Sequence, residues 1–417
     1  MTEAYIVGAF STRFSKWPDK SHKDLTREAY EGVLADAGLG DGADIEFAWF
    51  SNCAMWAQGQ GSIRGQVCFT PLVREGRFPE RVPLVNVEGG CASASMALHG
   101  AWKDVLAGQS RLSLAIGVEK TYVPDDPEAQ MAGFQGGIDC LDPDEWRAYY
   151  RAAGERAGKP FDEGPGRTVF MDTYAMQASH HMKTYGTTQA QIAAGAAKNH
   201  CNGALNPLSQ YKFQLTPEAV LEDREVSYPL TRSMCAPIGD GAAAVLVASA
   251  DYLKGQPRAV RDRAIRIAAS VLTGGKYRKL DEPGLSRLAG QKAYAMAGIG
   301  PDGIDLAEVH DATSFCEIYQ AEMLGFCAQG QGGPYVASGA TALDGELPIN
   351  TSGGLVSKGH PVGATGLSMI FELAAQLRGE AGPRQLREPR VALAENGGGV
   401  MGFDEAACGV TILERTH

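Results

Sequence analysis

Residues 84–108 read LVNVEGGCASASMALHGAWKDVLAG, and the rest of the chain can be placed around this stretch. Its first four residues favour a β-strand, the pair Gly89-Gly90 favours a tight turn, and apolar residues at helical spacing follow. The pattern therefore predicts a strand, a turn and a helix in immediate succession. Cys91 lies where the turn meets the helix, so it is the first candidate for a functional residue.

The position of Cys91 has two interpretations. At the start of a helix, free backbone N–H groups and the positive end of the helix dipole lower the pKa of a thiol, and the thiolate is the nucleophilic form. The small residues 92–95 leave room for a substrate beside the sulfur, which suits attack on an acyl carbon. The other interpretation is a buried, unreactive cysteine at a tight turn. These residues alone leave both open.

The composition is that of a globular protein with a large core. The chain has 417 residues, 44% of them hydrophobic and 21% charged, which is enough for two or three domains. Its net charge of −11 and the lack of a basic run argue against a nucleic-acid surface. No apolar stretch reaches the ~18 residues of a membrane span, and the first residues are typical of a strand and loop rather than of a secretory leader. We therefore expect a cytoplasmic protein.

The cysteines are scattered along the chain. There are nine of them, and they form no CxxC pair and no Cys/His group of the zinc-finger type. An odd number of dispersed cysteines is typical of free thiols in a reducing compartment. We expect most of them to be small core residues, and we expect no bound metal.

The chain contains an internal duplication. A helix over 25–39 and a strand over 45–50 are predicted early in the sequence. A helix over 288–299 and a strand over 304–309 repeat them, and the helix endings AGLG and AGIG mark the same point in both copies. The chain is therefore expected to fold as two related halves.

The duplication predicts that Cys91 and His360 meet. Asn86, in the strand before Cys91, matches Asn350, and the helix after Cys91 matches a helix over 364–377. His360 stands just before that second helix. Two such halves imply a pseudo-twofold axis, which would bring the starts of the matching helices close to one another. We therefore expect Cys91 and His360 to share a site.

Strands alternate with helices of ten to fifteen residues. This alternation is typical of right-handed βαβ units and predicts mainly parallel sheets covered by helices. About 120 residues separate the predicted strands over 112–117 and 242–248, which is too long for a plain loop. Helices are predicted within this segment over 169–185 and 188–199, and the second opens with a T-x-x-Q capping box.

Three stretches carry a resemblance to a known family. They are GCAS at 90–93, GDGAA at 239–243 and INTSGGLVSKGHPVGATG at 349–366. In this order they resemble the nucleophile motif, the return strand and the catalytic histidine motif of the thiolase superfamily. The chain is most similar to sterol-carrier-protein-type thiolases and their bacterial and archaeal relatives. A benzoylsuccinyl-CoA-type thiolase subunit is one specific candidate.

The resemblance implies an α/β fold in which duplicated βαβαβαββ halves form a five-layer αβαβα core with an inserted loop domain. The N-terminal half would cover 1–118 and be completed by 238–256, with the loop domain at 119–237 and the C-terminal half at 257–417. The resemblance also implies a homodimer. A small zinc-ribbon/OB-fold protein is a candidate companion, because some relatives work with one.

The resemblance further implies roles for four residues. Cys91 resembles the nucleophile that takes an acyl group from coenzyme A as a thioester, and His360 resembles the histidine that activates it. His310 resembles the histidine that helps to bind the thioester oxygen. The backbone N–H groups of Cys91 and Gly398 resemble a second oxyanion hole. Without the resemblance, His310 and His360 could be strand-end and loop histidines with structural roles.

The sequence departs from the family at a second cysteine, which handles the proton on the α-carbon of the substrate. The two places where relatives carry this cysteine hold Ala312 and Asn396. Cys316, four residues beyond Ala312, is either a replacement or a packing residue. Cleavage of a β-keto thioester requires only that an enolate be reprotonated, for which water, His310 or Glu395 would suffice.

Three functions are consistent with these residues. The first is an acyl-CoA thiolase that cleaves, or forms, a β-ketoacyl-CoA C–C bond through an acyl-Cys91 thioester. It would use acyl-CoA and coenzyme A as substrates, without a permanently bound cofactor, and act on a bulky or aromatic acyl group. The second is a condensing enzyme of the decarboxylating ketosynthase type, which shares the Cys-His-His set. The third is a non-catalytic lipid-binding or scaffold protein, against which the intact Cys91, His310 and His360 count.

Overall fold

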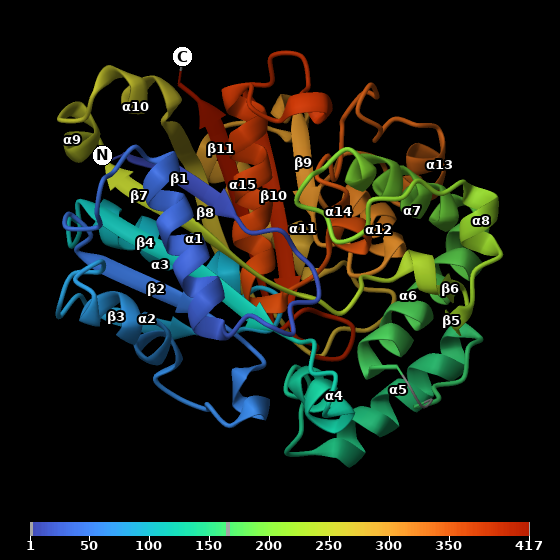
Figure 1. Ribbon diagram of the computed structural model, residues 1–417. Helices are drawn as coiled ribbons and strands as arrows, with labels where there is room; N and C mark the ends of the chain where they lie inside the picture. Colours follow the sequence, from blue (N-terminus) through green and yellow to red (C-terminus); the bar gives the residue numbers. More distant parts are fainter. Residues whose placement is uncertain (1–2, 164–166, 417) are drawn as a thin grey trace.

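The computed structural model describes residues 3–163 and 167–416, which form two related halves (Figure 1). The second half has an isolated bridge at Ile349 where the first has the strand before Cys91. The first half contains β1 (Ala4–Ser11), α1 (His22–Asp36), β2 (Phe47–Ser51), α2 (Arg64–Arg74), β3 (Leu84–Val87), α3 (Ser93–Leu106), β4 (Leu112–Lys120) and β7 (Asp240–Ser249). The second contains β8 (Ile265–Gly274), α11 (Leu285–Ala297), β9 (Leu306–Val309), α12 (Ser314–Met323), α13 (Gly332–Ala337), α14 (Gly354–Lys358), α15 (Thr365–Arg378), β10 (Val391–Gly398) and β11 (Ala407–Arg415). The short helices α9 (Ala250–Lys254) and α10 (Arg258–Arg263) join the halves.

The strands of both halves belong to one sheet of nine strands in the order β3-β2-β4-β7-β1-β8-β11-β10-β9. The halves meet where β1 pairs with β8. The expectation of mainly parallel pairing is wrong: β2 is parallel to β3 and β4, and β9 to β10, but the other five neighbouring pairs in the sheet are antiparallel. The reason is that each half ends in two strands with no crossover helix on the sheet between them, so the last strand returns beside the previous one.

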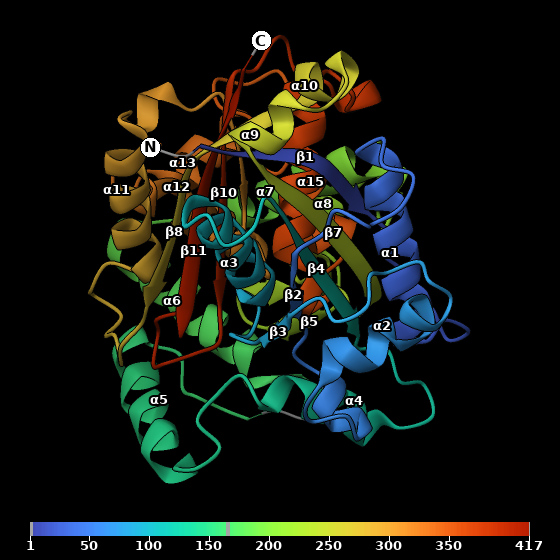
Figure 2. The same cartoon turned by 90° about the vertical axis from the view of Figure 1, so that its left-hand side faces the viewer.

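Helices cover both outer faces of the sheet and fill the space between its halves (Figures 1 and 2). The helices α1 and α2 pack on the first half, α11 and α12 pack on the second, and α3 and α15 lie between the two. This arrangement confirms the expected five layers. Leu98 of α3 and Leu373 of α15 are fully buried in the central layer, where each such side chain stabilises the fold by roughly 1.5–3 kcal/mol. The packing of these two helices sets the positions of the residues at their starts.

The chain between β4 and β7 forms a helical body of its own. It contains α4 (Pro127–Gln135), α5 (Pro143–Ala157), α6 (Val169–Tyr185), α7 (Gln189–Ala204), α8 (Pro217–Leu221) and the short paired strands β5 (Glu225–Ser227) and β6 (Leu230–Thr231). Two predicted helices are confirmed as α6 and α7, and the capping box of Thr188 and Gln191 is present. The exact domain boundaries stay a prediction. Among the described residues, no helix combines the length and the hydropathy needed to cross a bilayer.

Candidate active site

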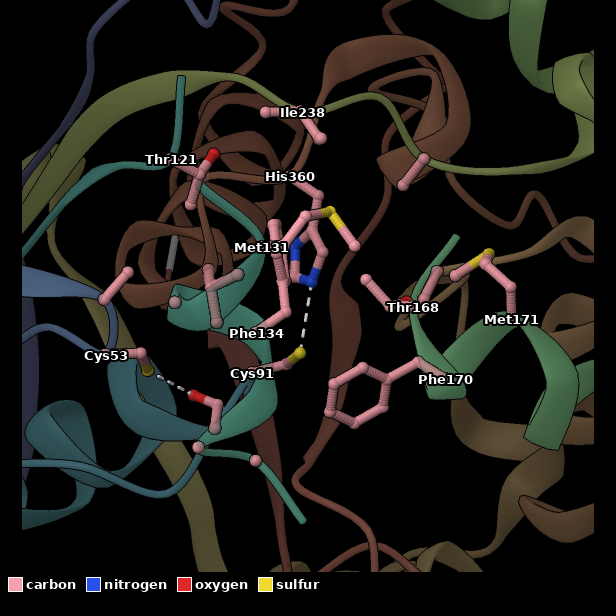
Figure 3. Close-up of a pocket in the computed structure, with 18 of the residues that line it drawn as sticks. Cys53, Cys91, Thr121, Met131, Phe134, Thr168, Phe170, Met171, Ile238 and His360 are labelled. Carbon is pink, nitrogen blue, oxygen red and sulfur yellow. Dashed lines mark hydrogen bonds between the residues drawn. The ribbon is translucent and has the colours of Figure 1, made fainter. Parts of the chain in front are cut away.

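Cys91 is held in place by the turn between β3 and α3. Gly90 has a φ of +58°, and a Cβ at this position would clash with the backbone of Gly399, so only glycine fits. Ser93 closes the turn, because its hydroxyl donates to the Gly90 carbonyl (2.6 Å) and accepts the Gly89 N–H (2.8 Å). The predicted strand, turn and helix are confirmed, and the thiol faces a cavity (Figure 3).

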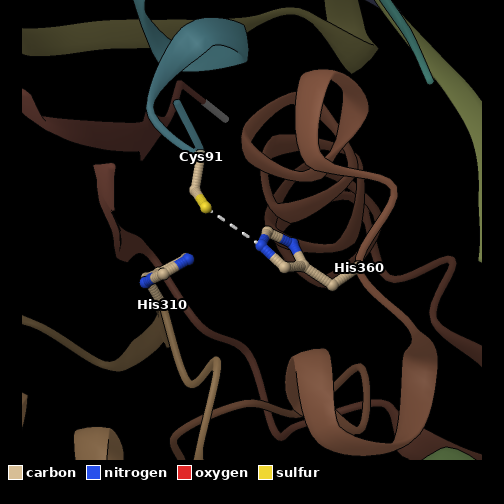
Figure 4. Close-up of side chains that lie close together, drawn as sticks. All are labelled: Cys91, His310 and His360. Atoms are coloured by element: carbon tan, nitrogen blue, oxygen red, sulfur yellow. Dashed lines mark hydrogen bonds between the residues drawn. The ribbon is translucent and has the colours of Figure 1, made fainter. Parts of the chain in front are cut away.

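His360 approaches the sulfur of Cys91 from the second half (Figure 4). Its Nε2 lies 3.2 Å from the Cys91 Sγ, which confirms that the two residues meet. Its Nδ1 lies 2.7 Å from the hydroxyl of Thr365, and that hydroxyl donates its own proton to the Pro361 carbonyl at 3.1 Å. The Thr365 oxygen therefore accepts from Nδ1–H. This tautomer leaves the Nε2 lone pair free to take the thiol proton.

His310 completes a cluster of three side chains (Figure 4). It directly follows β9, and its ring centroid is 5.2 Å from that of His360. One side-chain nitrogen or sulfur atom from each of Cys91, His310 and His360 lies within 4.8 Å of the others. The His310 Nε2 is buried and has no hydrogen-bond partner in the described part of the chain, so it is free to bind a substrate oxygen. The three atoms could also ligate a soft metal ion, which would block the thiol.

Gly398 lies directly against the backbone of Cys91. It is the last residue of β10, and a Cβ at this position would clash with the backbone nitrogens of Cys91 and Ala92. Only glycine therefore allows the end of β10 to come this close to the turn. The contact brings together the two backbone segments that were expected to form an oxyanion hole, and their role as donors stays a prediction.

Burial keeps the thiol and both imidazoles neutral at neutral pH. Burial and, to a lesser extent, the charges of Glu119 and Glu88 raise the pKa of Cys91 to about 12. Burial lowers the pKa of His310 to about 4, and burial together with the neighbouring His310 lowers the pKa of His360 well below its usual range. The low thiol pKa favoured by the helix start is wrong. The loss of hydration destabilises the thiolate more than the helix N-terminus stabilises it. Ionisation therefore requires an acceptor, and His360 is in contact.

Glu119 fixes two loops around the site, and the sequence analysis missed it. Its buried carboxylate, at the end of β4, accepts the backbone N–H groups of Cys53 (2.8 Å), Ala54 (3.0 Å) and Gly363 (2.9 Å). Gly363 follows His360 closely, so the carboxylate ties the histidine loop to the first half. Burial raises the pKa of Glu119 to about 7. The signal in the sequence was a single acid near the end of an otherwise apolar strand.

A Glu119→Gln variant should be less stable than the wild type. Each carboxylate oxygen accepts two hydrogen bonds, so one pair of buried donors would face the new NH2 group. Unpaired buried donors lower stability, and we expect the free energy of unfolding to fall by about 1–3 kcal/mol. Urea unfolding of both proteins measures this. Asp251→Asn, at an exposed position, is the matched control, and equal stability of wild type and Glu119→Gln would contradict the anchoring role.

Buried acids also hold the loop that precedes His360. Glu308, on β9, accepts the backbone N–H of Ser352 at 3.0 Å and its hydroxyl at 2.5 Å. Asp311 accepts the backbone N–H of Leu355 at 2.6 Å. These bonds fix the loop to the strand that carries His310, so the two histidines keep a constant separation.

The two positions expected to hold a second cysteine have different surroundings. Ala312 lines the cavity, whereas Asn396 is buried and its Oδ1 accepts a hydrogen bond from the Ser95 hydroxyl at 3.0 Å. Cys316 is buried, its Sγ lies 3.4 Å from the hydroxyl of Thr313, and it is not among the residues that line the cavity. The geometry favours the packing interpretation of Cys316.

The cavity beside Cys91 is apolar and has a volume of about 420 Å³ (Figure 3). Both halves and the helical body between β4 and β7 contribute side chains to it, including Trp56, Met131, Phe134, Phe170, Met171 and Ile238. His360 and Ala312 lie in its wall with Cys91. A small organic molecule that enters the cavity therefore reaches the sulfur among apolar surroundings.

Comparison with known proteins agrees with this architecture. The chain matches the family models described as "Thiolase, N-terminal domain" over residues 4–225 and "Thiolase C-terminal domain-like" over residues 283–415. It is 34% identical over 407 residues to an acetyl-CoA acetyltransferase of Methanothermobacter thermautotrophicus, which covers 96% of this chain and 98% of that protein. It is 31% identical to sterol carrier protein 2 of Rattus norvegicus over 100% of this chain and 74% of that protein.

Two further similarities concern more specialised proteins. The benzoylsuccinyl-CoA thiolase subunit BbsB of Thauera aromatica is 28% identical, over 95% of each chain. A solved structure of an Ltp2-ChsH2(DUF35) aldolase superposes with a TM-score of 0.77 at 22% identity, over 99% of this chain and 98% of the other, and shows the shared fold.

The fold, the matched family models and the relatives define a thiolase-type acyltransferase. The chain belongs to the thiolase family, which confirms the resemblance seen in the three sequence stretches.

Proposed function

We propose that this enzyme cleaves a β-ketoacyl-CoA with coenzyme A through a thioester on Cys91. The observation that carries the proposal is the 3.2 Å contact between the Cys91 Sγ and the Nε2 of His360 in the wall of an apolar cavity. A neutral imidazole with a free lone pair is the acceptor that a thiol with a raised pKa needs. An intact nucleophile and base also count against a purely lipid-binding or scaffold role.

Each residue of the site has one task in this reaction. His360 takes the thiol proton, and Cys91 attacks the β-keto carbonyl, whose oxyanion is stabilised by the backbone N–H groups of Cys91 and Gly398. When the C–C bond breaks, its electron pair passes to the leaving thioester as an enolate, and the Nε2 of His310 binds that oxygen. The enolate takes up one proton, equivalent to the one that His360 received from Cys91, and leaves as an acyl-CoA. Coenzyme A then attacks the acyl-Cys91 thioester, and His360 takes its thiol proton and returns it to the Cys91 sulfur as the acyl group leaves.

The acyl group in this proposal is bulky and apolar, with an aromatic ring as one candidate. Binding cavities for small organic molecules measure roughly 300–1,000 Å³, and the cavity here reaches about 420 Å³. Phe134, Phe170 and Met131 line the same cavity as the Cys91 sulfur (Figure 3). An acetyl group would leave most of this apolar surface uncovered. The similarity to BbsB, named for benzoylsuccinyl-CoA, supports the same substrate class.

Arg224 is our candidate anchor for the phosphates of coenzyme A. A chain with a net charge of −11 needs local positive charge to hold them. Of the arginines that line the cavity, Arg64 donates to the Asn52 carbonyl (2.5 Å) and Arg167 pairs with Asp172 (2.8 Å). The guanidinium of Arg224 has no ion-pair partner within the described ranges, so it is available to an anion.

A panel of β-ketoacyl-CoA esters tests the proposal. The protein is incubated with coenzyme A and acetoacetyl-CoA, 3-ketooctanoyl-CoA or benzoylacetyl-CoA, and the acyl-CoA products are quantified by mass spectrometry. We expect kcat/KM for one of the two larger esters to exceed that for acetoacetyl-CoA at least tenfold. Cleavage of none of them would reject the reaction, and fastest cleavage of acetoacetyl-CoA would reject only the bulky substrate.

A decarboxylating condensation is the second candidate function. The absence of a cysteine at Ala312 favours it, because loss of CO2 creates the carbanion without a base at the α-carbon. Release of labelled CO2 from malonyl-CoA in the presence of an acylated enzyme would support this candidate over thiolysis.

We also infer a cytoplasmic homodimer, with a small zinc-ribbon/OB-fold protein as a candidate companion. Among the described residues, the edge strand β3 pairs with β2 alone, so its other side offers backbone groups to a second chain. The free cysteines suit a reducing compartment. The companion is suggested by the Ltp2 structure, which contains a second protein, ChsH2(DUF35). Light scattering that gave the mass of one chain would contradict the dimer.

An Ala312→Cys variant should cleave acetoacetyl-CoA faster than the wild type. Ala312 lies in the cavity wall, where a thiol would add a second proton donor for the enolate. Because the existing donor remains, the cleavage rate should rise several-fold. This rise is smaller than the roughly 10²–10⁴-fold that a general acid or base contributes to a rate. Initial rates of acetyl-CoA formation measure it, with Ala312→Ser as the matched control. An unchanged rate would show that proton delivery at Ala312 does not limit turnover.

A further inference from the structure

Tyr174 presents a free phenol to the cavity that holds the nucleophile. It lies on α6, and its side chain lines the cavity together with those of Cys91, His360 and Ala312. Its ring packs against a buried cluster that includes Phe315 of α12. In the described part of the chain, no group forms a hydrogen bond with the Tyr174 hydroxyl, so this hydroxyl is available to a molecule in the cavity.

The two other thiols that line the cavity are already engaged, and the Nε2 of His310 is assigned to the enolate oxygen. The thiol of Cys53 donates to the Gly90 carbonyl at 2.9 Å, and the thiol of Cys235 donates to the Thr231 carbonyl at 3.4 Å. Glu395 accepts a backbone N–H at 3.1 Å and does not line the cavity. Tyr174 therefore differs from them in having an unengaged hydroxyl in the cavity wall.

The surroundings of Tyr174 keep its phenol protonated. Burial raises the pKa of Tyr174 well above 10, and negative charge on Cys316, Cys91 or Glu405 would raise it further. Tyr174 lines the same cavity wall as Cys91 and Ala312, and α6 packs against α12, whose start Ala312 closely precedes. A neutral phenol can donate a proton to a carbanion, whereas it is unsuited to removing one from carbon.

We propose that Tyr174 donates the proton that the α-carbon of the leaving thioester takes up when the substrate C–C bond breaks. This assignment rests on the proposed cleavage of a β-ketoacyl-CoA. In it, Tyr174 acts from α6, in the cavity wall, in place of the cysteine that is absent at Ala312.

The proton balance of this step closes within the site. His360 first takes the proton of Cys91, and the C–C bond then breaks with its electron pair on the α-carbon. The α-carbon takes the proton of the Tyr174 hydroxyl, which leaves a phenolate beside a protonated His360. Transfer of the proton from His360 to Tyr174, through water in the cavity, restores both groups. The products are an acyl-CoA protonated at its α-carbon and acyl-Cys91, which coenzyme A then attacks.

A Tyr174→Phe variant tests the assignment through two assays on the same protein. Cleavage of acetoacetyl-CoA and benzoylacetyl-CoA requires proton delivery to carbon and should fall about 100-fold or more. Exchange of labelled coenzyme A into acetyl-CoA or benzoyl-CoA passes through acyl-Cys91 without any carbanion, and should stay within about twofold. The matched control is Tyr319→Phe, because its hydroxyl is likewise unpartnered among the described residues but lies outside this cavity.

A double variant separates proton donation from packing. Ala312→Cys in the Tyr174→Phe background should restore cleavage at least tenfold, because it returns a proton donor to the cavity. Unchanged cleavage by Tyr174→Phe would overturn the assignment while leaving the proposed function intact. Equal loss of cleavage and exchange would also overturn it, since that pattern indicates a packing role. If the wild type neither exchanges coenzyme A nor cleaves either ester, the proposed function fails and this assignment fails with it.

Discussion

A Cys91→Ala variant should form no acyl adduct and should cleave β-ketoacyl-CoA esters at least about 10⁴-fold more slowly than the wild type. The reason is that Cys91 is the thiol in contact with His360, and alanine leaves no group to attack the carbonyl. Intact-mass spectrometry after a brief incubation with acetoacetyl-CoA or benzoylacetyl-CoA should show a mass increase of one acyl group on the wild type only.

Cys140→Ala is the matched control for the adduct, because Cys140 is the exposed cysteine and the easiest to acylate without catalysis. Its adduct and cleavage rate should equal those of the wild type. An adduct that persisted in Cys91→Ala would place the acyl group elsewhere. Absence of any adduct in the wild type, together with absence of turnover, would leave both enzymatic proposals without their intermediate.

A His360→Ala variant should lose about 10²–10⁴-fold in the rate of Cys91 acylation at pH 7. Burial raises the pKa of the Cys91 thiol to about 12, so without an acceptor only a minute fraction of the thiol ionises near neutrality. Raising the pH increases that fraction about tenfold per unit below the pKa. The residual rate of the variant should therefore rise steeply between pH 7 and 9, whereas the wild-type rate should change little.

Acylation rates are measured by rapid quenching and mass spectrometry at each pH. His180→Ala is the control, because His180 lies outside the cavity that contains Cys91. A flat pH profile for His360→Ala would mean that the thiol has another acceptor. A Thr365→Val variant extends the test, since Thr365 holds the Nδ1–H tautomer, and its loss should be smaller than that of His360→Ala.

Local sequence patterns predicted those parts of the site whose structure depends on residues close to one another in the sequence. The strand, the two glycines and the helix around Cys91 follow from residue types over 25 positions, and the duplication then located His360. His310 has no local signal of its own, and only the resemblance identified it. The pairing direction of the sheet was predicted wrongly. The last strand of each half, β7 or β11, runs antiparallel to the strand before it, and hydrophobic periodicity does not indicate strand direction.

Contacts between distant segments account for what the sequence analysis missed. Glu119 accepts hydrogen bonds from residues 65–67 and 244 positions away, and Tyr174 packs beside Phe315 of α12, far along the chain. The shift in the pKa of Cys91 has the same origin, because dehydration of the sulfur depends on every wall of the cavity. The position of Cys91 at the start of a helix therefore predicts where the thiol lies, but it does not predict the protonation state of the thiol.

The sulfur of Cys91 and the imidazole of His360 stand 269 positions apart in the chain. During synthesis, the ribosome releases the first long before the second exists, and the flanking Gly398 arrives later still. A nascent or truncated N-terminal half thus carries a thiol with no proton acceptor beside it. We therefore expect the N-terminal half alone to form no acyl adduct on Cys91.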